Sequence, residues 1–385
     1  MTAALAKKRV LFVDDDAAIL SGLNHLLFRE RKRWDLVFAN GGEEALAELR
    51  RGAFDVVVSD MRMPGMDGAA LLATIRNEFP SVVRVMLTGY AEREALARAL
   101  PVIHQLLNKP CSGKTLRGAL ERSMSLGSLE GDATLKPLIG GLDKLPSPPA
   151  LYRQVAAALS SPDTALVDVA SLVGSDPAMC AKVLQLVNNA CFDEVTPTCS
   201  IEDALELLGT EQLGYVAMTA SVFGSLDDAR GESVDAIQEA SLRCARLAER
   251  FVDGPGRTDV FVAALLHDVG RLVLSLASGE RCMLVGERVA AGAARCDAER
   301  EAFGVTHAEV GACLLAIWGI PGSIVDLVRC HHDPAAAAEP LRTYAAAVHV
   351  ADALTVGRDP DLASLERAGM LDRLDEWRRV AASWT

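Results

Sequence analysis

The first 125 residues alternate short apolar runs with longer amphipathic stretches, and this alternation restricts the fold more than any other feature of the sequence. The apolar runs cover residues 10–13, 36–39, 54–59, 84–88 and 105–108, and the amphipathic stretches cover 17–29, 42–51, 67–78, 92–99 and 112–124. Continuous apolar runs are typical of buried parallel strands, and right-handed crossovers place helices on both faces of such a sheet. We therefore predict an α/β domain with a doubly wound, five-stranded parallel sheet.

Polar residues follow four of the five predicted strands. Asp14 and Asp15 follow the first strand, Asp60 the third, Thr88 the fourth and Lys109 the fifth. Ligands of doubly wound sheets bind beyond the carboxyl ends of the strands, so we expect these side chains to meet at one edge. A third acid, Asp16, precedes a predicted helix and has the position of an N-cap.

This set of residues suits phosphoryl chemistry. Carboxylate oxygens are the ligands that Mg²⁺ takes, with water completing its octahedron. A carboxylate is also a nucleophile, and nearby cations reduce its repulsion from an incoming phosphoryl group. With Mg²⁺ and Lys109 offsetting charge, Asp60 could attack phosphorus and become an acyl phosphate.

Four motifs resemble the receiver domain of two-component response regulators, a flavodoxin-like α/β fold. They are VDDD at 13–16, SDMRMPGMDG at 59–68, LTG at 87–89 and NKP at 108–110. The resemblance covers about residues 8–124. It implies that the chain takes a phosphoryl group from a histidine kinase or phosphotransfer protein.

The resemblance also assigns roles within the site. Asp60 is the expected phospho-acceptor, and the expected Mg²⁺ ligands are Asp14, Asp15, Asp60 and the backbone carbonyl of Arg62. Thr88 is expected to turn toward the phosphoryl group and Lys109 to pair with it. By the same analogy the Lys109–Pro110 bond is cis. The family often has an aromatic switch residue three positions before the lysine, where this chain has Leu106.

The sequence changes character after the predicted sheet. We predict a receiver domain at 1–125 and a linker at 126–139, a region with many Ser, Gly and acidic residues. Beyond it, Ala- and Leu-rich stretches of helical period run to the end. We divide this part into an N-terminal helical subdomain at 140–230 and a second one at 231–385 that includes a helical extension.

The helical part resembles the HD-related output domain, HDOD, over about residues 138–335. The similar stretches are LPSPP at 145–149, VGSDPAM at 173–179, LVNNA at 186–190, SIEDALELLG at 200–209 and LLHDVGRL at 265–272. The resemblance implies an all-α fold whose second subdomain is related to the HD superfamily of metal phosphohydrolases. HDOD proteins have no generally established catalysis.

An incomplete hydrolase site follows from this relationship. HD hydrolases hold a divalent ion with an upstream histidine, a His-Asp dyad and a later aspartate. In this chain, His267 and Asp268 correspond to the dyad and Asp352 to the later aspartate. Three more histidines resemble the extra ligands of two-metal members: His307, His331 and His332. The upstream histidine is missing, since no histidine occurs between 105 and 266; our alignment places Ala240 there. Cys244 lies one turn away, where a buried cysteine more often packs than binds metal.

We therefore expect a vestigial site without a transition metal and an output made by protein contact. The alternative is a metal-dependent phosphodiesterase that acts on a nucleotide or cyclic dinucleotide under control of the receiver. A third possibility is a nucleotide sensor that does not hydrolyse its ligand.

Composition limits the classes of molecule that the chain can bind and the compartment in which we expect it. The net charge is −13, and all of the excess acid lies after Gly127, so we expect no direct contact with nucleic acid. Nine scattered cysteines without a C-x-x-C pair fit reduced thiols. We read no membrane span or secretory signal and expect a cytoplasmic protein. Family analogy adds a homodimer and an unknown downstream protein.

Overall fold

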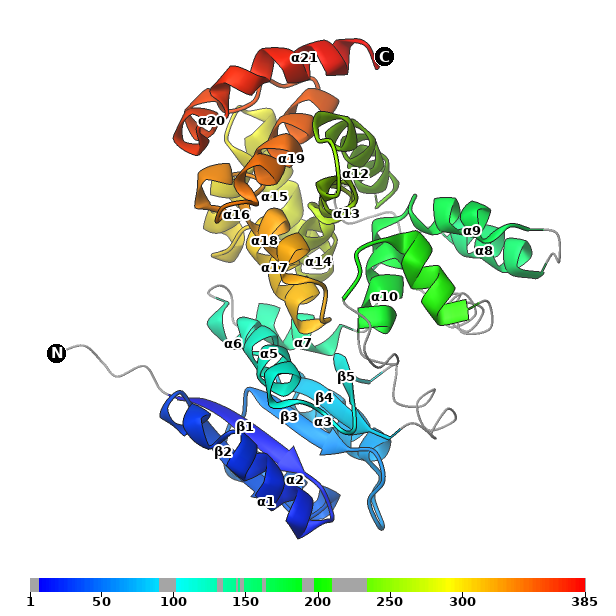
Figure 1. The fold of residues 1–385 in the computed structure, drawn as a ribbon. Coiled ribbons are helices and arrows are strands. Elements are labelled where there is room, and N and C mark those ends of the chain that lie inside the picture. The colour runs from blue at the N-terminus through cyan, green and yellow to red at the C-terminus, as the bar shows by residue number, and fades with distance from the viewer. Residues whose placement is uncertain are drawn as a thin grey trace. The chain divides into compact units, whose positions relative to one another are not determined.

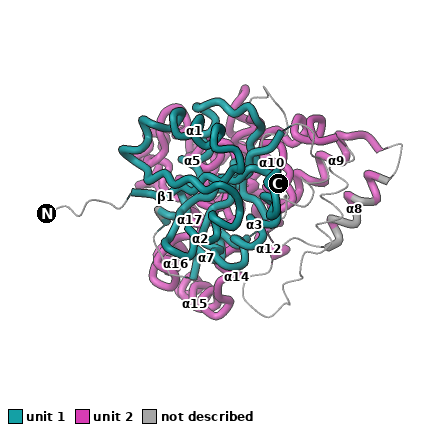
Figure 2. Tube along the Cα trace, turned by 90° about the horizontal axis from the view of Figure 1, so that it is seen from below, with its two compact units in different colours: residues 1–143, 189–194, 316–319 teal, residues 144–188, 195–315, 320–385 magenta. Residues whose placement is uncertain are grey.

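A computed structural model describes residues 7–89, 102–129, 134–142, 145, 149–160, 164–188, 197–209 and 234–384. The chain divides into two compact units. Unit 1 comprises 1–143, 189–194 and 316–319, and unit 2 comprises 144–188, 195–315 and 320–385 (Figure 2).

Unit 1 contains the predicted sheet. Its strands are β1 (Lys8–Val13), β2 (Trp34–Ala39), β3 (Val56–Asp60), β4 (Val83–Thr88) and β5 (Gln105–Asn108). All neighbouring strands are parallel and the order is β2-β1-β3-β4-β5, as Figure 1 shows. The prediction of a five-stranded, doubly wound parallel sheet is confirmed.

Helices follow the strands of this sheet. They are α1 (Ala17–Leu26), α2 (Gly42–Arg51), α3 (Gly68–Glu78) and α5 (Gly113–Ser123). Asp16 caps α1, because its side chain accepts a hydrogen bond from the backbone N–H of Ala18. The first helix is shorter than predicted, and the basic run after it forms a 3₁₀ turn, η1 (Phe28–Lys32). The helix predicted at 92–99 lies outside the described residues.

The end of unit 1 includes residues that we assigned to a linker. They form α6 (Ser125–Ser128) and α7 (Leu135–Gly141). The backbone N–H of Arg84 donates to Nδ1 of His104 (2.9 Å), so Nε2 carries the hydrogen and donates to the carbonyl of Gly140 (2.9 Å). A Cβ atom on Gly140 would lie 2.1 Å from the carbonyl oxygen of Pro80. The close approach of α7 to the sheet domain therefore depends on this glycine.

Among the described residues of unit 2 all regular elements are helices, which confirms the predicted all-α region (Figure 1). Its first part comprises α8 (Pro149–Ser160), α9 (Leu166–Val173), α10 (Pro177–Asn188) and a helix at 201–209. Its second part comprises α12 (Val234–Ala248), α13 (Gly256–Leu266), α14 (Val269–Ala277), α15 (Gly279–Ala290), α16 (Arg295–Phe303), α17 (His307–Ile317), α18 (Gly322–Cys330), α19 (Arg342–Thr355), α20 (Leu362–Ala368) and α21 (Leu374–Ala382). Short 3₁₀ turns are η2 (Glu249–Phe251), η3 (Pro334–Ala336) and η4 (Leu371–Arg373).

One predicted helix is interrupted. The apolar stretch at 259–276 forms two helices, because α13 ends at Leu266 and α14 begins at Val269, leaving His267 and Asp268 at the junction.

Among the described residues, Gly256–Ala277 is the one helical stretch long and apolar enough to cross a membrane by length and composition. It is 72% buried over its apolar window, as in the core helix of a soluble protein.

Candidate functional site

The carboxyl ends of three strands bring a lysine between two aspartates. Asp14 follows β1, Asp60 ends β3 and Lys109 follows β5. The Nζ atom of Lys109 donates to Oδ2 of Asp14 at 2.8 Å and to Oδ1 of Asp60 at 2.5 Å. The Asp14 side chain is 3% exposed and that of Asp60 is 13% exposed, so the inner acid is shielded while the expected acceptor is reachable.

Backbone groups fix both carboxylates. The N–H of Asp16 donates to Oδ1 of Asp14 (2.9 Å), and the N–H of Arg62 donates to Oδ2 of Asp60 (2.8 Å). Burial lowers the pKa of Lys109, but its hydrogen bonds to the carboxylates of Asp14 and Asp60 outweigh this effect and raise the pKa above its ordinary value. Lys109 is therefore charged at any physiological pH.

The remaining predicted residues lie at the same edge. Asp15 follows β1 with an exposed side chain. Thr88 ends β4, one residue beyond Leu87, which pairs with Asp60 in the parallel register. The oxygens of Asp14, Asp15 and Asp60 form a hard, anionic donor set, which fits Mg²⁺. The carbonyl of Arg62 would supply a neutral oxygen.

Glycine at position 68 lets helix α3 start beside the expected acceptor. A Cβ atom there would lie 2.0 Å from the carbonyl oxygen of Asp60. The N–H of Gly68 donates to the carbonyl of Met61 at 2.9 Å, which fixes the loop between β3 and α3. Packing therefore requires glycine at position 68, the last residue of the 59–68 motif.

Two further expectations concern the fifth strand. The Lys109–Pro110 bond is cis, as the resemblance implied. Leu106, at the position of the family's switch aromatic, pairs with Met86 of β4 and is 1% exposed. Its side chain belongs to the core of unit 1.

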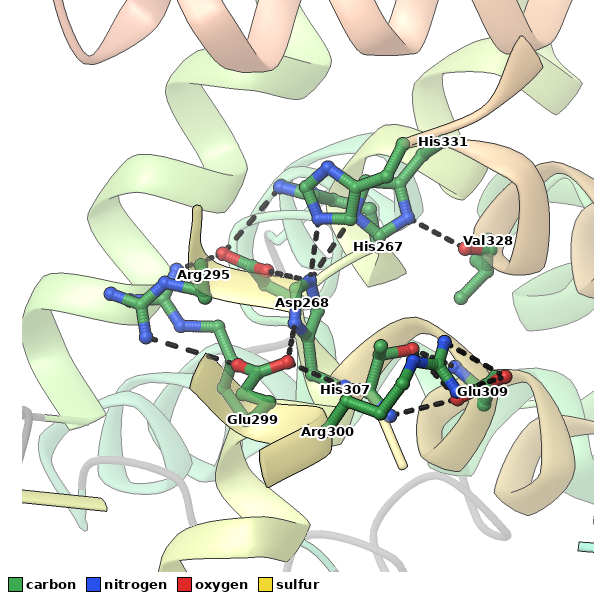
Figure 3. A network of polar contacts seen from close by, with 12 residues as sticks. His267, Asp268, Arg295, Glu299, Arg300, His307, Glu309, Val328 and His331 are labelled. Atoms are coloured by element: carbon green, nitrogen blue, oxygen red, sulfur yellow. Dashed lines mark hydrogen bonds and ion pairs between the residues drawn. The ribbon is translucent and has the colours of Figure 1, made fainter. Parts of the chain in front are cut away.

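A second cluster lies in unit 2, where the junction between α13 and α14 places His267 and Asp268 side by side (Figure 3). Three buried imidazoles there have their Nδ1 atoms engaged. Nδ1 of His267 faces the carbonyl of Ala264, that of His331 faces the carbonyl of Val328, and that of His307 faces Oε2 of Glu299, each at 2.6 Å. Since each of these acceptors needs a hydrogen, Nδ1 carries it and Nε2 is left as an acceptor.

The Nε2 atoms converge. Nε2 of His307 lies 3.3 Å from Nε2 of His331 and 3.0 Å from Nε2 of His332. Nε2 of His267 is buried and has no hydrogen-bond partner among the described residues. Two acceptor nitrogens that face each other, as those of His307 and His331 do, are stabilised by a cation or a proton between them.

Two carboxylates complete this cluster. Oδ1 of Asp268 lies 3.3 Å from Nε2 of His307, and Oδ2 lies 3.5 Å from Nε2 of His267. Oδ1 of Asp352 lies 3.6 Å from the same nitrogen of His267. Arg271, one turn further along α14, pairs with Asp268. The structure thus brings together all six predicted residues of the HD-like site.

The pKa values of the histidines in this cluster are shifted in opposite directions. Burial lowers the pKa of His267, but Asp268 and Asp352 outweigh burial and raise it to about 9. Burial and the neighbouring imidazoles lower the pKa of His331 to about 3 and place that of His332 well below its usual range. Arg271 and the histidines oppose the effect of burial on Asp268 and hold its pKa well below the ordinary value. The two carboxylates therefore favour positive charge beside Nε2 of His267, which a proton on that nitrogen or a bound cation can supply.

Cys244, which lies one helical turn from the position of the missing upstream ligand, has contacts typical of a packed thiol. Its thiol is buried in α12, and burial, with Asp352 and Asp268, raises its pKa well above the ordinary value. Its Sγ atom faces the carbonyl of Val348 at 4.0 Å. These contacts favour a packing role.

Sequence reasoning missed Glu299 and Cys296. Glu299 is 2% exposed, and its Oε2 accepts from both the backbone N–H (2.9 Å) and Nδ1 (2.6 Å) of His307. Cys296 lies on the same helix, α16, and can share a cation with His307 and His332. Neither residue belongs to a motif; the one local signal is their position just before His307.

Known proteins resemble both parts of the chain. Residues 10–121 match the family model described as response regulator receiver domain, and residues 145–334 match the model described as HDOD domain. The chain is 35% identical over 127 residues to the response regulator protein FleR of Pseudomonas aeruginosa, covering 32% of this chain and 26% of FleR. An uncharacterized protein of Treponema pallidum is 27% identical over 204 residues, covering 50% of this chain and 38% of that protein.

A solved structure also matches part of the chain. The MmoQ response regulator of Methylococcus capsulatus matches with 26% identity and a TM-score of 0.48, covering 62% of this chain and 98% of that one. The chain spans less than half the length of the two curated relatives named above.

Proposed function

The chain is a response regulator with a receiver domain at 10–121 followed by an HDOD domain at 145–334, and from this we propose how its two parts act. The receiver accepts a phosphoryl group on Asp60 from a cognate histidine kinase or phosphotransfer protein. The HDOD domain responds through contact with a downstream protein. The contact of Lys109 with both Asp14 and Asp60 supports the assignment of Asp60 best.

The chemistry follows from these contacts. An oxygen of the Asp60 carboxylate attacks phosphorus of a phosphohistidine, an O–P bond forms, and the P–N bond to the imidazole breaks. Asp14, Asp15, Asp60 and the carbonyl of Arg62 would hold Mg²⁺, which supplies positive charge to the phosphoryl oxygens. Lys109 supplies further positive charge from the side of β5, and Thr88 lies at the end of β4 to hydrogen-bond the transferred group.

Removal of Lys109 tests this assignment. We expect Lys109→Ala to slow phosphorylation by acetyl phosphate with Mg²⁺ by about 100-fold, because one preorganised cation at the transferring group is lost. Arg62→Ala is the control, since it keeps the backbone carbonyl and the N–H that bonds Asp60. Rates come from intact-protein mass spectrometry. Equal rates for Lys109→Ala and wild type would contradict the proposed role.

We also propose that the receiver acts as part of a cytoplasmic homodimer and that phosphorylation changes the HDOD surface offered to the partner. The transferred group adds local negative charge, and such a charge biases a two-state element. The acidic balance of the chain after Gly127 argues for a protein partner rather than nucleic acid.

The converging imidazoles favour a second candidate, a metal-dependent phosphohydrolase in the HDOD domain. His267, Asp268, His331 and Asp352 would hold a divalent ion, which would supply an activated water for attack on phosphorus. The orphaned Nε2 of His267 and the nearby carboxylates fit such an ion.

A turnover assay tests this candidate. The candidate predicts Mn²⁺-dependent hydrolysis of bis(4-nitrophenyl) phosphate by the full chain and its loss in Asp268→Ala. Asp326→Ala, which removes an exposed carboxylate of α18 in the same unit, should leave the rate unchanged. The candidate fails if the wild type binds Mn²⁺ without turnover, or if both variants hydrolyse the ester equally.

A further inference from the structure

We propose that Cys296, His307 and His332 form a second metal position, with the cysteine as a thiolate ligand, next to the group made by His267, Asp268 and His331. The proposal rests on the second candidate above for the inner group and adds a distinct outer site with its own ligands. The chemistry of the outer ligands points to Zn²⁺ or a similar transition metal.

The three outer ligands come from three elements. Cys296 lies in the first turn of α16, His307 is the first residue of α17, and His332 follows the end of α18. Their ligand atoms all lie within 4.8 Å of one another. Two nitrogens bound at about 2.1 Å to one tetrahedral ion are roughly 3.4 Å apart. The 3.0 Å between the Nε2 atoms of His307 and His332 is close to this spacing.

Glu299 gives His307 the second contact that metal-bound histidines have. The buried carboxylate accepts from Nδ1 and from the backbone N–H of His307, which fixes both the tautomer and the direction of Nε2. A carboxylate behind a ligating imidazole orients the ring and makes it a better donor. Glu299 is thus a positioning residue, and Arg295 offsets part of its charge at 3.9 Å.

Three acceptor atoms of the buried residues lie close together where the two groups meet. Nδ1 of His307 and Nδ1 of His331 hold their hydrogens toward Glu299 and Val328, so the two Nε2 atoms face each other as lone pairs at 3.3 Å. Oδ1 of Asp268 lies 3.3 Å from the same nitrogen of His307. Three acceptors at this spacing repel one another, and a cation between them removes the repulsion.

Asp268 faces both positions. Its Oδ2 is turned to His267 of the inner group and its Oδ1 to His307 of the outer group. One carboxylate can therefore bridge two ions. The groups differ in exposure, because all three inner residues are buried, whereas Cys296 and His332 are partly exposed. The outer ion is consequently expected to exchange more readily with solution.

Cobalt substitution tests the outer position without any activity assay. The full-length chain, stripped with a chelator, is titrated with Co²⁺, and bound metal is counted by plasma mass spectrometry. A thiolate ligand gives a sulfur-to-cobalt charge-transfer band in the near ultraviolet, which nitrogen and oxygen ligands do not give. Metal binding by Cys296 also releases the thiol proton, which is a second readout.

We expect two Co²⁺ per chain and the charge-transfer band in the wild type. Cys296→Ser should lose the band and one Co²⁺, while Cys282→Ser, which replaces another partly exposed thiol of unit 2, should keep both. Glu299→Gln should weaken the outer site by 10- to 100-fold while keeping the band at saturation. Circular dichroism checks that each variant is folded.

The outcomes separate this proposal from the one it builds on. Binding of one Co²⁺ without the band, or a band that persists in Cys296→Ser, overturns the outer position and leaves the inner group intact. Absence of any bound Co²⁺ overturns both positions and the phosphohydrolase candidate with them.

Discussion

Asp60→Asn is expected to abolish phosphorylation of the chain by acetyl phosphate and Mg²⁺. The amide of asparagine is a poor nucleophile toward phosphorus and cannot form an acyl phosphate. The substitution keeps the shape of the side chain, and the neutral oxygen can still accept hydrogen bonds from Lys109 and from the N–H of Arg62. The fold of unit 1 should therefore survive, and the loss should be specific to chemistry.

The measurement is intact-protein mass spectrometry, with peptide mapping to locate the phosphoryl group. Asp35→Asn is a matched control, because Asp35 is an exposed acid of the same sheet that pairs with Arg9, away from the strand ends. It should be phosphorylated like the wild type. Labelling that persisted in Asp60→Asn would show that another residue is the acceptor.

Gly270→Ala is expected to disrupt the HD-like site by packing alone. A Cβ atom at position 270 would lie 1.9 Å from the carbonyl oxygen of His307, so α14 and α17 must separate. Overpacking of this kind costs about 1–3 kcal/mol. Because His307 and Asp268 lie on the two elements that separate, their 3.3 Å contact should be lost as well.

Hydrogen exchange gives the local stability of α14 and α17 in the full chain, where one global unfolding free energy is not defined for two units. Gly286→Ala is the control. Gly286 is an exposed residue of α15 whose added Cβ would meet nothing within 4 Å, so the change should stabilise that helix by up to about 1 kcal/mol. Equal protection of α17 in Gly270→Ala and wild type would contradict the packing account.

The sheet could be predicted closely because its signals are local. Runs of Val, Leu and Phe mark each strand, and turn residues mark the ends, so the expected strand at 105–108 coincides with β5. The proximity of Asp14, Asp60 and Lys109 could also be predicted from the sequence, since parallel strands place their carboxyl ends at one edge of the sheet. Motif spacing sufficed for this part of the site.

The helical unit was less predictable. Helical periodicity continues through residues 259–276, and this pattern does not indicate that the helix ends before His267. The break that places His267 and Asp268 at a junction between two helices was therefore not predicted. The role of Glu299 depends on a tertiary turn. Gly304, with φ of 77°, ends α16 in the left-handed region and reverses the chain so that Glu299 meets His307. Contacts of this kind do not follow from sequence spacing.

The expectation of a metal-free site had one basis, the missing upstream histidine. The structure adds observations of another kind: an orphaned Nε2 on His267, facing lone pairs on His307 and His331, and a buried carboxylate behind His307. Unpaired acceptor atoms of this kind fit a cation. They are the reason for the proposed outer position with Cys296.

The central claim is that phosphorylation of Asp60 changes the HDOD domain. Hydrogen exchange of residues 234–384 in the full chain, with and without acetyl phosphate and Mg²⁺, tests it most directly. We predict a change in protection within these helices in the wild type and none in Asp60→Asn treated in the same way. Complete phosphorylation of the wild type with identical exchange throughout residues 234–384 would contradict the account.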